Sequence, residues 1–198
     1  ELRDGARLAW RHPLLRPILF TAIAWNAAWF VLQAAYVPYA MRSLGLDASA
    51  VGVTLACYGA GMVVGALLAA RVLRALPFGR AILVGPFMSV AASLVMAATL
   101  CWPSGVLAAV SFFMFGAGPI LWSITSTTLR QTVTPGAMLG QVSAMFLTVN
   151  TGVRPLGAAL GGAIGAAYGE AACLIVAAPG FAVQATISGG YLNLPDGN

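Results

Sequence analysis

Lysine is absent from this 198-residue sequence, and carboxylates and histidine are scarce, with five acidic residues and one histidine. Charged residues make up only 8% of the chain, whereas soluble domains usually carry about 25%. A soluble fold with so few charges could not cover its surface with polar groups. Without lysine the chain also cannot form the phosphate-binding loop of ATP-driven motors. The composition therefore argues against a soluble domain and against an ATPase.

Catalytic and metal-binding groups are equally scarce. The one histidine, His12, lies in the N-terminal segment, and no carboxylate falls within an apolar run. Neither an acid–base pair nor a serine–histidine pair can then be placed inside a membrane. Cys57, Cys101 and Cys173 follow no pairing or ligand pattern and are expected to act as small hydrophobic residues. We expect no enzyme activity, no catalytic residue, no metal and no cofactor.

Long apolar runs are what the sequence does contain. Hydrophobic residues make up 60% of the chain, and its mean hydropathy is +0.90. A membrane-spanning helix needs about 20 mostly apolar residues. We predict an all-α membrane protein with six transmembrane helices, at about 16–40, 49–72, 79–100, 104–128, 138–168 and 171–188. They form a domain over residues 16–188, preceded by an amphipathic cytoplasmic entry segment (1–15) and followed by a cytoplasmic tail (189–198).

The basic residues, all ten of them arginine, set the orientation of these helices. Arg42 alone marks one side of the predicted bundle, and the other side carries Arg3, Arg7, Arg11, Arg16, Arg71, Arg74, Arg80 and Arg130. This asymmetry is typical of cytoplasmic loops under the positive-inside rule and unlike the basic face of a nucleic-acid-binding protein. We therefore predict that both termini of this segment lie in the cytoplasm, in a multi-pass protein of the bacterial inner membrane.

The two halves of the sequence show a weak internal similarity. The stretch "GALLAARVLRALPFGR" (65–80) is similar to "GAALGGAIGAAYGE" (157–170), and each ends the second of three predicted helices. Two three-helix repeats have opposite orientations in the membrane, because an odd number of spans reverses the chain direction. The sequence thus suggests two inverted three-helix repeats, the alternative being a coincidence of small residues.

Glycines recur every four residues on two of the predicted helices. They are Gly61 and Gly65 on the second, and Gly157, Gly161 and Gly165 on the fifth. Small residues at this spacing let helix backbones approach closely in a membrane. We predict a packing role for them, and such faces would also allow helices to slide during transport.

A polar stripe runs along the first predicted helix. Asn26, Trp29, Gln33 and Tyr36 fall at relative positions 0, 3, 7 and 10. Amide groups in a membrane are unfavourable against lipid, so the stripe should face the bundle interior. It is either a set of hydrogen bonds between helices or a cavity wall that contacts a substrate.

Arg154 is the only charged residue between Gln131 and Gly169, and Asn150 lies one helical turn before it. An arginine at the membrane centre costs roughly 2.5–3.5 kcal/mol on insertion scales, so it needs a partner. The candidates are carbonyls freed by Pro155, a carboxylate on another polypeptide, and an anionic ligand. On the fourth predicted helix, Gly118 and Pro119 predict a kink, after which Trp122 is a further candidate substrate contact.

The order of these features resembles the C-terminal six-helix half of a major facilitator superfamily transporter. The stretches that carry the resemblance are "LGLDASAVGVTLACYGAGMVVGALLAARVLRALPFGR" and "LRQTVTPGAMLGQVSAMFLTVNTGVRPLGAALGG". They are most similar to bacterial exporters of the enterobactin-exporter and macrolide-efflux type.

The resemblance implies half of a transporter whose two six-helix halves enclose a cavity and rock against each other. Substrate-binding residues would be Asn26, Trp29, Gln33, Tyr36, Trp122, Asn150 and Arg154. The expected function is proton-coupled export of small amphipathic molecules of drug or siderophore type. The expected partners are the lipid bilayer, the missing N-terminal half, a small-molecule substrate and protons, and nucleic acid is not among them. The alternative function is a non-transporting membrane scaffold or partner-binding module.

Overall fold

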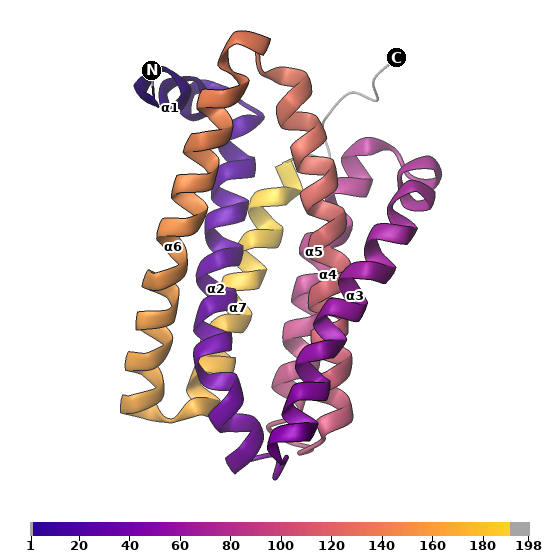
Figure 1. The fold of residues 1–198 in the computed structure, drawn as a ribbon, viewed down its shortest axis with the longest axis vertical. Coiled ribbons are helices and arrows are strands. Elements are labelled where there is room, and N and C mark those ends of the chain that lie inside the picture. The colour runs from indigo at the N-terminus through magenta and orange to yellow at the C-terminus, as the bar shows by residue number, and fades with distance from the viewer. Residues whose placement is uncertain (1, 191–198) are drawn as a thin grey trace.

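The computed structural model describes residues 2–190, which form helices without a β-strand. The elements are α1 (Leu2–Arg11), α2 (Leu15–Arg42), α3 (Ala48–Ala75), α4 (Phe78–Ala98), α5 (Gly105–Val133), the 3-10 turn η1 (Gly136–Met138), α6 (Leu139–Tyr168) and α7 (Glu170–Ser188). The long helices form an upright bundle and α1 lies across one end of it (Figure 1). Helices α2 to α7 coincide with the six predicted runs. Residues 191–198 of the predicted tail lie outside the described residues.

Five helices of the described chain, α2, α3, α4, α5 and α7, are long and apolar enough to cross a membrane. Several such helices in one chain indicate a multi-pass membrane protein. Helix α6, at 30 residues, is long enough but is not among the five. Its glycines, together with Gln141, Asn150 and Arg154, lower its hydropathy. Six helices had been predicted to span the membrane, and hydropathy alone supports five of them.

The long helices pack as two groups of three. Helix α5 packs against both α3 and α4, and α2 packs against both α6 and α7. The main contact between the groups runs from α4 to α7, whereas α2 touches α3 and α5 only slightly. In Figure 1, α2, α6 and α7 accordingly stand beside α3, α4 and α5. The chain thus passes from one group to the other and back.

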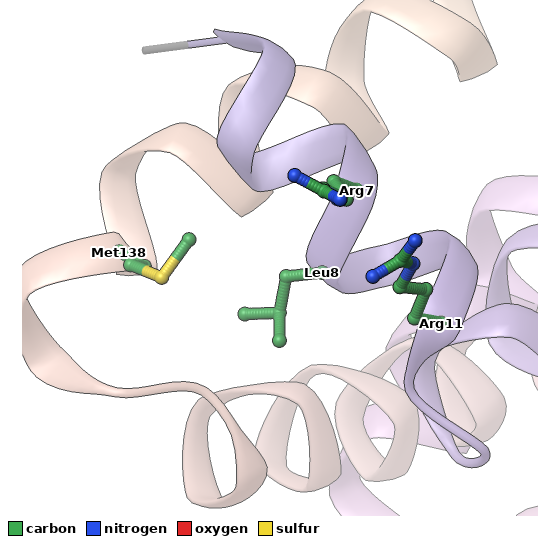
Figure 2. A pocket seen from close by; sticks show the side chains of 4 residues that line it. All are labelled: Arg7, Leu8, Arg11 and Met138. Atoms are coloured by element: carbon green, nitrogen blue, oxygen red, sulfur yellow. The ribbon is translucent and has the colours of Figure 1, made fainter.

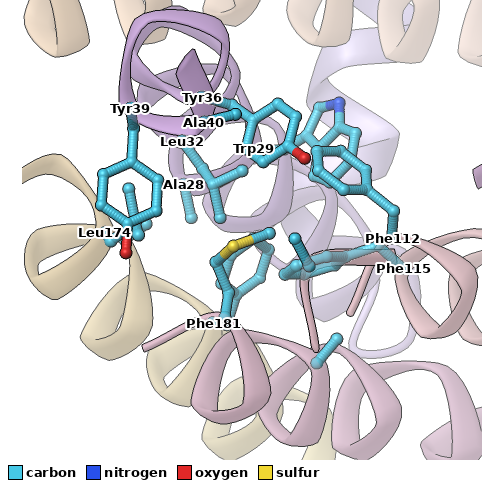
Figure 3. Packing of buried hydrophobic residues seen from close by; sticks show 14 of the residues in the cluster. Ala28, Trp29, Leu32, Tyr36, Tyr39, Ala40, Phe112, Phe115, Leu174 and Phe181 are labelled. Atoms are coloured by element: carbon cyan, nitrogen blue, oxygen red, sulfur yellow. The ribbon is translucent and has the colours of Figure 1, made fainter. Parts of the chain in front are cut away.

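Aromatic side chains fill the core where α2, α5 and α7 meet (Figure 3). Trp29 lies at its centre, with ring centroids 5.9 Å from Phe112 and 5.0 Å from Phe115, both edge-on. Phe115 in turn contacts Phe181 of α7 at 4.9 Å. Large aromatic rings bury the most apolar surface per residue, and edge-to-face pairs add to that stabilisation. This cluster joins the two helix groups.

Close backbone approaches occur within each group, at glycines. A Cβ added to Gly61 would lie 2.1 Å from the carbonyl oxygen of Phe113 on α5, and one added to Gly65 would lie 2.4 Å from that of Ala117. On α6, Gly157 and Gly161 approach α2 in the same way, against the carbonyls of Ala27 and Val31 at 2.9 and 2.7 Å. Only glycine fits at such distances, so these four positions hold helix pairs together.

Gly165 departs from its predicted packing role, and Gly118 has a packing role that was not predicted. A Cβ at Gly165 would meet only the sulfur of Cys173, at 3.7 Å, which is ordinary contact and requires no glycine. Gly118 and Pro119 lie within the continuous helix α5. Gly118 also allows close packing against α4, because its Cβ would lie 2.6 Å from that of Met88.

The end of the bundle where α1 lies also holds the C-terminal ends of α3 and α5 and the start of α4 (Figure 1). Arg71 and Arg74 belong to the last turns of α3, Arg80 to the first turn of α4, and Arg130 to the last turn of α5, so all four lie in helices and not in loops. At the opposite end, Arg42 donates to Glu170 at 2.6 Å. This is the one ion pair among the side chains that the structure describes.

Candidate functional site

A cavity of about 320 Å3 lies between the two helix groups. We call it the central cavity. Its described lining comes from the first and second long helix of each half of the chain, namely α2, α3, α5 and α6. The lining residues are Ala22, Trp25, Asn26, Tyr58, Met62, Gly116, Pro119, Ile120, Trp122, Ser123, Asn150 and Arg154. Four of the predicted substrate-binding residues are therefore brought together: Asn26, Trp122, Asn150 and Arg154.

Arg154 binds an amide of α2. Its Nε donates a hydrogen bond to Oδ1 of Asn26 at 3.2 Å, and its guanidinium lies 5.7 Å from the ring centroid of Phe30. Asn26 is buried and fixed in orientation, because its Nδ2 donates to the carbonyl of Ala22 at 2.9 Å. Arg154 itself is exposed in this chain, and at exposed sites a cation–π contact stabilises by about 0.5–1 kcal/mol. The arginine is thus held by α2 and not by carbonyls freed at Pro155.

The charge of Arg154 remains uncompensated by protein. Within the described part of the chain no carboxylate pairs with it, and no protein atom accepts a hydrogen bond from its terminal nitrogens. An amide orients a guanidinium but leaves its charge unneutralised. The cavity is therefore electropositive at this point.

Other polar atoms of the lining also lack partners. Nε1 of Trp25, Nε1 of Trp122 and Oδ1 of Asn150 are buried without a hydrogen bond to any described residue. A buried polar group left unpaired costs about 1–3 kcal/mol, so such groups concentrate where a ligand or water completes them. All three atoms belong to side chains that line the central cavity.

A second cavity of about 240 Å3 adjoins the first and extends toward the basic end. The two share Ala22, Trp122, Ser123 and Asn150 in their linings. The second adds hydroxyls from α5 and α6 and the half-buried Arg130, whose guanidinium lies 5.0 Å from the ring centroid of Phe146. Polar groups therefore line a route from Arg154 toward that end.

The predicted stripe on α2 divides into different environments. Asn26 lines the central cavity, but Trp29 and Tyr36 are 5% and 0% exposed and belong to the aromatic core. The hydroxyl of Tyr36 shares a hydrogen bond with that of Thr54 on α3. At about 100° per residue, Trp29 and Tyr36 lie roughly 60° and 80° around the helix from Asn26, which turns them toward α5. Their prediction as cavity residues requires correction, and the half-buried Gln33 does not line the cavity either.

Replacing Tyr36 by phenylalanine tests this core position. The change removes one buried hydrogen bond and is expected to lower the free energy of unfolding by about 1 kcal/mol without affecting ligand binding. Thermal unfolding in detergent measures the effect. Tyr168, which is 80% exposed, provides the control, because Tyr168→Phe should leave stability unchanged. A Tyr36→Phe protein of unchanged stability and weakened ligand binding would return Tyr36 to the cavity wall.

Trp25 and Tyr58 line the cavity although neither was among the predicted site residues. Trp25 stacks on Trp29, with ring centroids 5.4 Å apart and planes 14° apart, and Trp29 stacks on Tyr58 at 5.0 Å and 25°. Trp29 therefore supports both rings from behind. Its spacing of four residues from Trp25 was the available signal, since such pairs meet on a helix surface. Nothing local predicted Tyr58, which depends on how α3 packs.

A separate hollow of about 310 Å3 lies between α1 and the turn before α6 (Figure 2). Arg7, Leu8 and Arg11 extend from α1, and Met138 faces them across the gap. At the same end, the guanidinium of Arg16 lies 5.6 Å from the ring centroid of the exposed Trp10. Arginine and tryptophan together are typical of helices at a membrane surface. This hollow is set apart from the central cavity.

Comparison of the chain with models of protein families, with curated proteins and with solved structures finds no match. The cavity is lined by four helices and holds one arginine that no described carboxylate neutralises.

Proposed function

We propose that this chain is the C-terminal six-helix half of a secondary active transporter of the major facilitator type, a proton-coupled exporter of small amphipathic molecules. The observation that carries the proposal is the central cavity between the two helix groups, which is lined by Arg154 of α6 and its hydrogen-bond partner Asn26 of α2. Transporters built from repeats bind substrate near the membrane midplane, where the repeats meet.

The packing supports two three-helix repeats, α2–α4 and α5–α7. Between the two repeats, α2 corresponds to α5, α3 to α6, and α4 to α7. The contact of α2 with α6 then corresponds to that of α5 with α3, and the contact of α2 with α7 to that of α5 with α4. The contact between α4 and α7 maps onto itself. This pattern is expected of a pseudo-twofold axis that passes between the groups. In this arrangement α6 is the sixth membrane span, and its Asn150 and Arg154 line the cavity.

The close glycine contacts show the same correspondence between the two repeats. Gly61 and Gly65 of α3 meet carbonyls four residues apart on α5, and Gly157 and Gly161 of α6 meet carbonyls four residues apart on α2. The equivalence differs by one helical turn from the one suggested by sequence, since Gly65 corresponds to Gly161 and not to Gly157. It also explains why Gly165 makes no close contact.

The charge distribution supports the orientation and the need for a second half. The arginine-rich end faces the cytoplasm under the positive-inside rule, which places both ends of this segment there, in a bacterial inner membrane. Proton coupling requires a titrating group within the membrane. The sequence has no carboxylate inside α2 to α6, so the preceding half of the transporter must supply it.

An efflux assay tests the proposal. Cells that lack their own exporters would receive the chain alone, the chain with the coding sequence upstream of it, and the latter with Arg154→Ala. We expect efflux only from the joined form, and its loss in Arg154→Ala at equal membrane abundance. Arg42→Gln, at the far end of the bundle, is the matched arginine control and should retain efflux. If no joined form moves any compound of a broad amphipathic panel, the scaffold function replaces this one.

A further inference from the structure

We infer that the central cavity selects amphipathic anions, meaning molecules with a flat apolar body and one carboxylate or sulfonate group. The inference specifies the substrate class of the proposed transporter and rests on that function for its biological meaning. The binding itself follows from the chemistry of the cavity. Three features carry it: the net charge, the balance of donors and acceptors, and the apolar walls.

The cavity carries one positive charge and no described negative one. Asp47 and Glu170 both lie near the opposite end of the bundle, and Glu170 is already bound to Arg42. The remaining acidic residues of the sequence, Glu1, Asp4 and Asp196, lie outside α2 to α7. Arg154 is exposed in this chain, so its guanidinium is open to an anion that enters the cavity, and a carboxylate or sulfonate can bind it through two oxygens.

Unpaired donors outnumber unpaired acceptors among the side chains that line the cavity. An indole N–H can only donate, and those of Trp25 and Trp122 are both buried without an acceptor. The terminal nitrogens of Arg154 add further donors, and Oδ1 of Asn150 is the one unpaired acceptor among the buried lining atoms described. A cationic ligand would meet mostly donors and a like charge. A carboxylate or sulfonate accepts several hydrogen bonds and can bind a guanidinium through two oxygens.

The remaining walls suit a flat apolar body. The rings of Trp25 and Tyr58 are fixed by stacking on Trp29, and Met62, Pro119 and Ile120 complete the apolar lining. A volume of about 320 Å3 lies at the lower limit of small-molecule sites. One or two fused rings bearing a single anionic group therefore fit both its size and its chemistry.

Three isosteric probes separate charge from shape: 1-naphthoate, the neutral 1-naphthamide and the cationic 1-naphthylmethylammonium. Binding to the purified full-length protein, in nanodiscs of neutral phosphatidylcholine, would be measured by isothermal titration calorimetry. We expect naphthoate to bind at least about ten times more tightly than naphthamide, and naphthylmethylammonium to bind most weakly. Arg154→Gln should abolish the preference for the anion, Arg154→Lys should retain part of it, and the control Arg42→Gln should leave it intact.

Equal or tighter binding of the cation would overturn the inference, and so would a preference for naphthoate that survives Arg154→Gln. A thermal unfolding curve for each variant shows that the protein is folded when its affinity is read. If a carboxylate of the preceding half already neutralises Arg154, naphthoate gains nothing over naphthamide, which also refutes the inference. The calorimetric binding experiment involves no ion gradient, so it is independent of the efflux assay. Anion binding without efflux would refute the proposed transport but not this inference. Efflux without anion selectivity would refute this inference but not the proposed transport.

Discussion

Alanine at Gly61 is expected to lower the free energy of unfolding by about 1–3 kcal/mol, the usual cost of forcing an extra carbon into a packed interface. The new Cβ would lie 2.1 Å from the carbonyl oxygen of Phe113 and 2.9 Å from its carbon, so backbone atoms and not a flexible side chain would have to move. Helices α3 and α5 must then separate along their whole contact. Thermal unfolding in detergent, followed by circular dichroism, measures the loss.

The matched control lies two residues earlier on the same helix. A Cβ at Gly59 has nothing within 4 Å, and Gly59→Ala should stabilise α3 by up to about 1 kcal/mol through helix propensity alone. The two alanine substitutions should therefore shift the melting temperature in opposite directions. Equal effects at Gly59 and Gly61 would show that the α3–α5 pair is not closely packed.

Truncating Trp29 to alanine is expected to lower the free energy of unfolding by about 3–5 kcal/mol. The indole contacts Trp25, Tyr58, Phe112 and Phe115 and is 5% exposed, so its removal opens a large void where α2 meets α5. Ligand binding should weaken as well, because Trp25 and Tyr58 lose the ring that orients them. Denaturant titration by circular dichroism and calorimetric titration of the ligand separate the two effects.

Trp102 is the control for this truncation, since it is 69% exposed in the loop between α4 and α5. Trp102→Ala should leave both stability and binding nearly unchanged. Trp29→Phe should recover part of the stability, because a smaller ring still fills some of the void. If Trp29→Ala unfolds no more readily than the parent and only loses binding, Trp29 is a ligand contact, as the helical stripe had suggested.

The helices could be predicted from sequence because hydropathy is a local property, readable within each run of about 20 residues. Arg154 and Asn26 were each recognised for the same reason, as polar groups in apolar surroundings. Their pairing was not predicted, because the two residues are 128 positions apart and meet only when α6 packs on α2. The prediction that Trp29 lines the cavity was wrong for a related reason. Helical spacing places side chains on a face, but only the neighbouring helix decides whether that face is core or cavity.

The packing of α2 against the last two helices of the chain has a consequence for how the protein is made. Helix α2 is the most buried of the five apolar helices, and the helices that cover it, α6 and α7, are translated last. At ordinary synthesis rates roughly ten to thirty seconds separate α2 from α7. Throughout that interval Asn26 and the face of α2 that packs on α6 and α7 are without their partners. We therefore expect α2 to be shielded by the insertion machinery until synthesis ends.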